Sequence, residues 1–153
     1  MEERELSGPE KQAWASLSVS VLVWAFLAMR LTDGGRLADV GARHLVWTYV
    51  ATVVLMTVAH GVIAALLARR DGDQLKDERD AAIEARADRL EGYVVVGAIN
   101  VVVIHALADA AFVGHALPRI DLSSLPTLTF VLLTTLFVGH LVKQAAIIWQ
   151  YRA

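Results

Sequence analysis

The 153-residue sequence contains no cysteine and only three prolines. The absence of cysteine excludes disulfides, thiolate metal sites and cysteine nucleophiles. The formal net charge of −2 gives no sign of a basic surface, so we expect no direct nucleic-acid binding. The sequence also has no glycine-rich phosphate loop, serine elbow or His-Glu-x-x-His pattern. Because no polar region is large enough for an ordinary catalytic domain, these absences argue against an enzyme.

Apolar residues make up 56% of the chain, and they gather in four long runs. The runs predict spans over residues 12–31, 44–68, 92–116 and 125–149. Each run is close to the ~20 residues that cross ~30 Å of hydrocarbon. Because the runs do not alternate in polarity as barrel strands do, we expect α-helices. The sequence therefore predicts an all-α fold, in which residues 1–153 form a single integral membrane four-helix bundle.

The connection between the second and third runs is the most charged part of the chain. From Asp71 to Glu91 there are eight acids and four bases, and no helix breaker follows the Asp71-Gly72-Asp73 turn until Gly92. We therefore predict a cytosolic helix over residues 75–91 that continues into the third span. Ten lysines and arginines lie on the side of the termini and of this connection, against four on the other side. The positive-inside rule then places both termini in the cytoplasm.

The start of this helix carries Asp77, Glu78, Arg79, Asp80 and Ile83. It resembles the D-E-R-(D/E)-x-x-I segment of a family of small prokaryotic four-helix membrane proteins of unknown function. In that family the segment precedes the third span, as it does here. The resemblance implies the same layout of spans and a place in the prokaryotic cytoplasmic (inner) membrane. It carries no activity with it, although some members are encoded beside small helix-turn-helix regulators, which implies a regulatory pairing.

Ionisable groups also lie inside the predicted spans, at His60, His105, Asp109 and His140. Such groups are costly in hydrocarbon and usually face the interior of a bundle. Counted at ~1.5 Å per residue from the middle of each span, the three histidines fall within a slab of roughly 8 Å. His105 and Asp109 are four residues apart on one helix face, so the carboxylate is placed to orient the imidazole.

Three kinds of site remain open for these groups. The first is a transition-metal or zinc site of His60, His105 and His140, with Asp109 as a fourth or supporting ligand. The second is a b-type haem held by His60 and His140. The third is a path for protons or ions, since histidine titrates near neutral pH. The alternative to all three is that these side chains only form hydrogen bonds between helices, each pair contributing about 0.6 kcal/mol to stability.

Two functional hypotheses follow. In the first, the protein is a non-enzymatic interaction or regulatory protein that acts through the helix Asp77–Leu90, with Asp77, Glu78, Arg79, Asp80 and Ile83 as candidate contacts. Its partners are the lipid bilayer, a second copy of the chain and a cytosolic protein. In the alternative, the intramembrane histidines serve electron transfer or transport. A solvated juxtamembrane helix with a thin apolar stripe explains the charged segment equally simply.

Overall fold

The computed structural model describes residues 7–33, 36–37, 40–71, 77–111 and 120–153. Its elements are the helices α1 (Gly8–Leu31), α2 (Ala42–Asp71), α3 (Glu78–Ala111) and α4 (Leu125–Arg152), with strands β1 (Thr32–Asp33) and β2 (Arg36–Leu37) after α1. The two strands pair antiparallel over two residues each. All four helices are long and apolar enough to cross a membrane. The prediction of an all-α membrane four-helix bundle is confirmed.

The helices begin at residues whose side chains or rings suit a helix start. Ser7 Oγ accepts a hydrogen bond from the backbone N–H of Glu10 at 3.3 Å, which caps α1. Asp77 Oδ1 accepts from the backbone N–H of Asp80 at 2.7 Å and caps α3. Ser124 is the N-cap residue of α4, but its hydroxyl makes no capping hydrogen bond, and a proline follows in the first turn.

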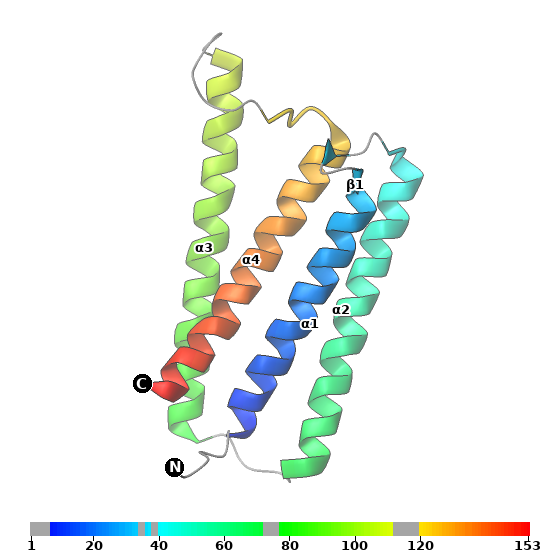
Figure 1. Cartoon of the computed structure of the whole chain (residues 1–153). Helices are drawn as coiled ribbons and strands as arrows, with labels where there is room; N and C mark the ends of the chain where they lie inside the picture. Colours follow the sequence, from blue (N-terminus) through cyan, green and yellow to red (C-terminus); the bar gives the residue numbers. More distant parts are fainter. Residues whose placement is uncertain (1–6, 34–35, 38–39, 72–76, 112–119) are drawn as a thin grey trace.

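The four helices lie roughly side by side, with α1 between α2 and α4, and with α4 between α1 and α3 (Figure 1). The start of α1 and the end of α4 lie at the same end of the bundle, which we call the terminal end; the opposite end is the far end. Helix α3 approaches α4 most closely near the terminal end (Figure 1). Its 34 residues form one continuous helix of about 51 Å, which is longer than the hydrocarbon core.

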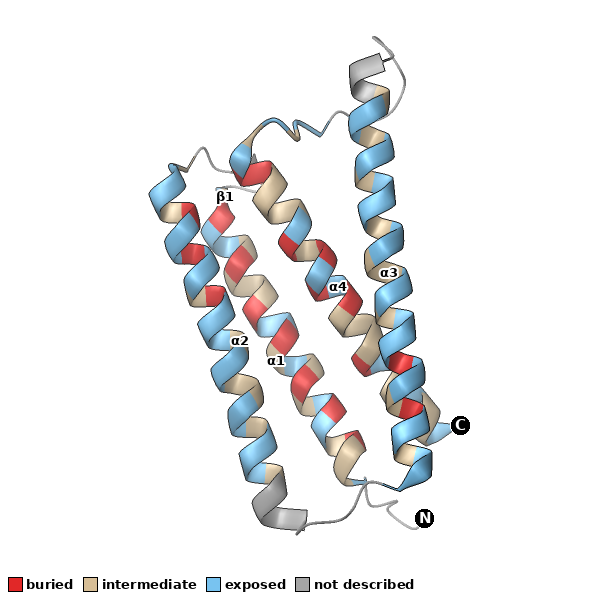
Figure 2. Cartoon of the chain, turned by 180° about the vertical axis from the view of Figure 1, so that it is seen from behind, coloured by how far each residue is buried: buried red, intermediate tan, exposed pale blue. Residues whose placement is uncertain are grey.

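The apolar core fills the far half of the bundle between α1, α2 and α4. It comprises Val23, Leu27 and Leu31 of α1, Leu45 of α2, and Leu133 and Phe137 of α4. Beside this core, Trp24 Nε1 of α1 donates a hydrogen bond to Thr134 Oγ1 of α4 at 3.2 Å. Figure 2 shows that buried residues follow α1, α4 and the far half of α2, whereas on α3 they are confined to turns near the terminal end.

Candidate intramembrane polar site

Four acidic residues in the first half of α3 share one face of the helix. They are Asp80, Glu84, Asp88 and Glu91, at spacings of four, four and three residues. Ile83 and Ala87, which fall on the same side, are the two buried hydrophobic residues of α3. The acids therefore lie along the edges of the face that packs against the bundle.

The arginines of α3 lie on its outer side. Arg79, Arg86 and Arg89 are all exposed, and Arg89 Nε donates to the backbone carbonyl of Ala85 at 3.2 Å. The segment has an excess of negative charge in sequence, but its outward surface is rich in arginine. The helix therefore separates its two kinds of charge: Asp88 and Glu91 lie on the side of Lys143 and His140, and the arginines lie on other sides of the helix.

This arrangement divides the five candidate interaction residues into two groups. Asp77 caps the helix, Ile83 is buried, and Asp80 accepts a hydrogen bond from Tyr151 Oη of α4 at 2.5 Å. These three act within the chain. Glu78 and Arg79 are exposed, so they are the members of the set that remain available to a partner.

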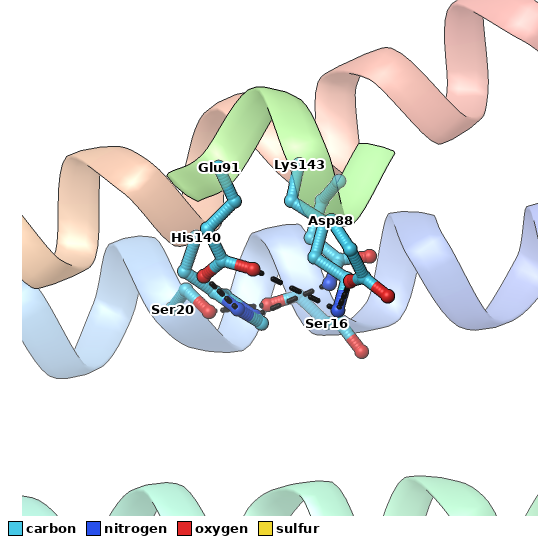
Figure 3. A network of polar contacts seen from close by, with 7 residues as sticks. Ser16, Ser20, Asp88, Glu91, His140 and Lys143 are labelled. Atoms are coloured by element: carbon cyan, nitrogen blue, oxygen red, sulfur yellow. Dashed lines mark hydrogen bonds and ion pairs between the residues drawn. The ribbon is translucent and has the colours of Figure 1, made fainter. Parts of the chain in front are cut away.

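Lys143 of α4 joins the two helices through ion pairs. Its Nζ lies 2.5 Å from Asp88 Oδ1 and 3.7 Å from Glu91 Oε2 of α3. The lysine side chain is only 22% exposed, whereas Asp88 is about half exposed. One positive charge thus faces two negative charges where α3 meets α4 (Figure 3).

His140, one turn earlier on α4, contacts the carboxylate of Glu91, which also faces Lys143. Its Nδ1 lies 3.7 Å from Glu91 Oε1. On the other side of the ring, Nε2 lies 3.2 Å from Nε2 of the buried Gln144, whose amide is then the donor. This pattern assigns the proton of the neutral imidazole to Nδ1, facing Glu91. Figure 3 shows these side chains gathered beside Ser16 and Ser20 of α1.

His60 of α2 lies against His140 with the two rings edge to face. The ring centroids are 5.3 Å apart, and the planes make an angle of 79°. His60 Nδ1 donates to the backbone carbonyl of Met56 at 2.9 Å. Its Nε2 is buried, and it has no hydrogen-bond partner among the residues that the structure describes. Burial of a nitrogen lone pair without a hydrogen-bond partner costs free energy.

Glycine permits α3 and α4 to approach closely beside this pair. A Cβ added at Gly139 would lie 2.5 Å from Val95 Cγ2 and 3.6 Å from the Glu91 side chain and carbonyl. Gly97, in contrast, has nothing within 4 Å of an added Cβ. The contact at Gly139 therefore fixes which turn of α3 lies level with His140.

A cavity of about 220 Å³ opens beside the two histidines toward the terminal end. Its polar lining includes Gln12 and Ser16 of α1, His60 of α2, Asp80 and Glu84 of α3, and His140, Lys143, Gln144 and Tyr151 of α4. The apolar core lies on the other side of the histidines. The cavity therefore lies in the terminal half of the bundle and presents polar side chains from all four helices.

The structure does not bring His105 to this pair. His105 Nε2 accepts a hydrogen bond from the backbone N–H of Ile120 at 3.3 Å, near the far end. It lies fourteen residues beyond Glu91, about 21 Å along α3. The side chain of Asp109 lies outside the described residues. Among the residues that are described, no three histidine, aspartate or glutamate side chains are placed to hold a metal ion.

The histidine pair also does not fit a haem. Axial ligands must present one nitrogen each to opposite sides of the iron. His60 and His140 instead meet edge to face at 5.3 Å between centroids, and both nitrogens of His140 already face side chains of the protein. His140 lies beside the Glu91 carboxylate, and both imidazoles line the cavity.

Three residues that form the ion pairs of this site were not among the sequence candidates, namely Asp88, Glu91 and Lys143. A signal for Lys143 was present, since it is a charged residue within a long apolar run. Asp88 and Glu91 lie one turn apart just before the third run, where charges are common, so their position alone does not distinguish them. Only the contact between α3 and α4 identifies them as partners of Lys143.

Comparison with models of protein families, with curated proteins and with solved structures finds no match for this chain. The resemblance of the segment that begins at Asp77 to a family of small prokaryotic membrane proteins therefore stays a prediction. What the chain is shown to be is a multi-pass membrane protein of four helices with a polar cluster where α3 packs on α4.

Proposed function

We propose that the chain is a non-enzymatic regulatory membrane protein in which proton binding at His140, which packs against His60, controls how firmly α3 is held against α4. The observation that carries the proposal is the position of His140, which contacts His60 of α2 on one side and Glu91 of α3 on the other. A charge placed on this pair therefore acts directly on the contact that anchors α3.

The charges around the pair set the direction of the effect. Lys143 is the one cation of this contact, and it faces Asp88 and Glu91. The other ionisable groups of the cavity are Asp80, Glu84 and Tyr151, whereas α1 contributes only uncharged polar groups. An imidazolium at His140 would lie half-buried beside Lys143 and His60, and this burial disfavours the charged form more than the nearby Glu91 carboxylate favours it. Proton binding should therefore weaken the attachment of α3, and proton loss should strengthen it.

The packing of α3 makes it the element that responds. Its strongest tertiary packing is against α4, and its apolar residues toward the far end are exposed. In a bilayer these surfaces contact lipid or a second copy of the chain, so a homo-oligomer is part of the proposal. A change in the position of α3 moves the exposed start of the helix, including Glu78, which a cytosolic protein partner would contact.

The proposed location is the prokaryotic cytoplasmic membrane with both termini in the cytoplasm. The excess of lysine and arginine on the terminal side supports this orientation. The cavity lies toward that side, and the apolar core lies beyond the histidines. This asymmetry favours sensing of cytoplasmic pH over passage of ions across the membrane.

A pair of spin labels tests the proposal. Because the chain has no cysteine, Ala85→Cys on α3 and Ala145→Cys on α4 introduce two unique labelling sites at exposed positions. In lipid nanodiscs, the distribution of distances between the labels should broaden or lengthen as the pH falls from about 8 to about 5. The His140→Gln variant should give a distribution that no longer depends on pH.

His44→Gln provides the matched control. His44 lies near the far end, where its Nε2 donates to the carbonyl of Arg30 at 3.3 Å. This variant should keep the full response of the parent protein. A distance distribution in the parent that does not change with pH, or an unchanged response in His140→Gln, would contradict the proposal.

A further inference from the structure

A basic groove lies between the first turns of α3 and the last turns of α4, on the side away from the histidines. Its volume is about 310 Å³, and Arg79, Arg86, Trp149 and Gln150 provide its polar and aromatic lining. The two arginines are seven residues apart, so they project from the same side of α3 two turns apart. The groove therefore holds two guanidinium groups beside one indole.

The positive charges of this groove are not compensated within the described part of the chain. Neither Arg79 nor Arg86 has an ion pair there. Two of the nearest acids are occupied elsewhere, since Asp80 accepts from Tyr151 and Asp88 pairs with Lys143. The separation of charge on α3 thus leaves an anion-attracting surface at the terminal end of the spans.

Trp149 connects this groove to an apolar one. The indole is 75% exposed, in the last turn of the fourth span, and tryptophan favours the interface between membrane and water. It also borders a second groove of about 430 Å³ between α1 and α4, which is lined mainly by Trp14, Leu17, Ala145 and Ile148. A basic surface and an apolar surface thus meet at a residue in the interfacial region.

We propose that these adjoining grooves bind an anionic phospholipid of the leaflet at the terminal end. The phosphate is held by Arg79 and Arg86, because guanidinium groups bind phosphate oxygens in a bidentate manner. The acyl chain lies past Trp149 along the apolar groove. Charge and apolar surface fit one molecule that has both a phosphate and a hydrocarbon chain, and basic pockets at the cytoplasmic side of spans are suited to such lipids.

This inference is independent of the histidine pair, because neither His60 nor His140 lines either groove. If the proton response is absent, the lipid site is unaffected, and the reverse also holds. Were both correct, a bound lipid would touch the same helix whose position the histidines control.

The decisive experiment compares two arginines of the same helix. Purified protein is equilibrated with equal amounts of phosphatidylglycerol and phosphatidylcholine, and the bound lipids are counted by native mass spectrometry. The parent protein should retain phosphatidylglycerol preferentially. Arg86→Gln should reduce that preference by about five-fold, the effect expected for one arginine at a membrane surface, and Arg79→Gln with Arg86→Gln should abolish it.

Arg89→Gln is the matched control, because it removes the same charge from an exposed position of α3 that does not line the groove. It should change the preference by less than about two-fold. Equal losses in Arg86→Gln and Arg89→Gln would overturn the proposal in favour of general attraction between charges. Equal retention of the two lipids by the parent protein would also overturn it.

Quenching of Trp149 provides a second readout that does not depend on the arginine variants. Phosphatidylglycerol with brominated acyl chains should quench a component of the tryptophan fluorescence that is missing in Trp149→Phe. Brominated phosphatidylcholine at the same concentration should quench that component less. Equal quenching by the two lipids would show that the indole faces bulk lipid, and the proposed site would be rejected.

Discussion

The far half and the terminal half of the bundle are held together in different ways. In the far half, α1, α2 and α4 share a cluster of buried apolar side chains around Leu27 and Leu31. In the terminal half, α3 is joined to α4 by polar contacts, which run from Tyr151 and Asp80 to His140 and Glu91. The far half therefore depends on apolar packing, whereas the terminal half combines a few buried apolar side chains, such as Ile83 and Ala87, with hydrogen bonds and ion pairs.

This difference indicates which half of the bundle is able to respond to a change in pH. Packing of apolar side chains changes little with pH, whereas contacts among histidine, lysine and carboxylates depend on which groups carry a proton. Interhelical polar contacts in membranes are also individually weak. A helix attached mainly through such contacts can be released without disturbing the apolar core.

The largest effect should come from a cavity in the far half. Leu27→Ala removes a fully buried side chain from the core, and we expect a loss of about 2–5 kcal/mol in the free energy of unfolding. Unfolding in a denaturing detergent, followed by circular dichroism, measures this loss. Leu22→Ala is the control on the same helix, since Leu22 is exposed, and it should change the free energy by less than about 0.5 kcal/mol.

A loss of comparable size in the two leucine variants would break the comparison. It would mean that the surface of α1 near Leu22 is also packed, for example against a second copy of the chain. The effect of Leu27→Ala should not depend on pH, because the leucine contacts only apolar groups in its cluster.

The next largest effect should come from the glycine contact between the halves. In Gly139→Ala the new methyl group meets Val95 Cγ2, so α3 must move outward or the valine must change rotamer. We expect a loss of about 1–3 kcal/mol and a longer distance between spin labels at positions 85 and 145. Gly97→Ala has open space around the new methyl group, so it should be neutral or stabilising by up to about 1 kcal/mol.

The sequence predicts much of the fold but not the register between helices. The four spans follow from long apolar runs, and the continuous helix α3 follows from the lack of a breaker before Gly92. The prediction that the three histidines share one depth assumes that the middles of the spans lie level. The contact of Gly139 with Val95 and Glu91 instead sets that part of α3 beside His140. His105 consequently lies far from the pair.

The sequence also does not predict how each helix is rotated about its own axis. The charged segment has an excess of acids, and nothing in its composition indicates that these residues point inward. Their orientation follows from Lys143, His140 and Tyr151 on α4, which provide the partners. Tertiary contacts therefore decide that Asp80 and Ile83 act within the chain while Arg79 faces outward.

A smaller effect should come from the hydrogen bond at the terminal end. Tyr151→Phe removes the hydroxyl that donates to Asp80 Oδ1, and we expect a loss of about 0.5–1.5 kcal/mol. Hydrogen exchange should increase in the first turns of α3 and stay unchanged in α1. Tyr93→Phe removes a hydroxyl from an exposed position of α3 and should leave the exchange in the first turns of α3 unaltered. Equal exchange in the two variants would show that Asp80 does not anchor the helix.

The smallest effect should lie in the loop before α4, where the charge contacts are local to the loop. The hydroxyl and then the backbone N–H of Ser123 hold the pKa of Asp121 below its ordinary value of 3.8. A lowered pKa means that the bonds stabilise the loop above pH 3.8, and that this contribution is lost as the pH falls through the lowered value. Ser123→Ala should raise the pKa of Asp121 toward 3.8, as measured from its carboxyl chemical shift. Ser124→Ala keeps the backbone N–H that also faces Asp121, so it should leave the titration in place. If the two variants titrate alike, the hydroxyl of Ser123 is not the cause.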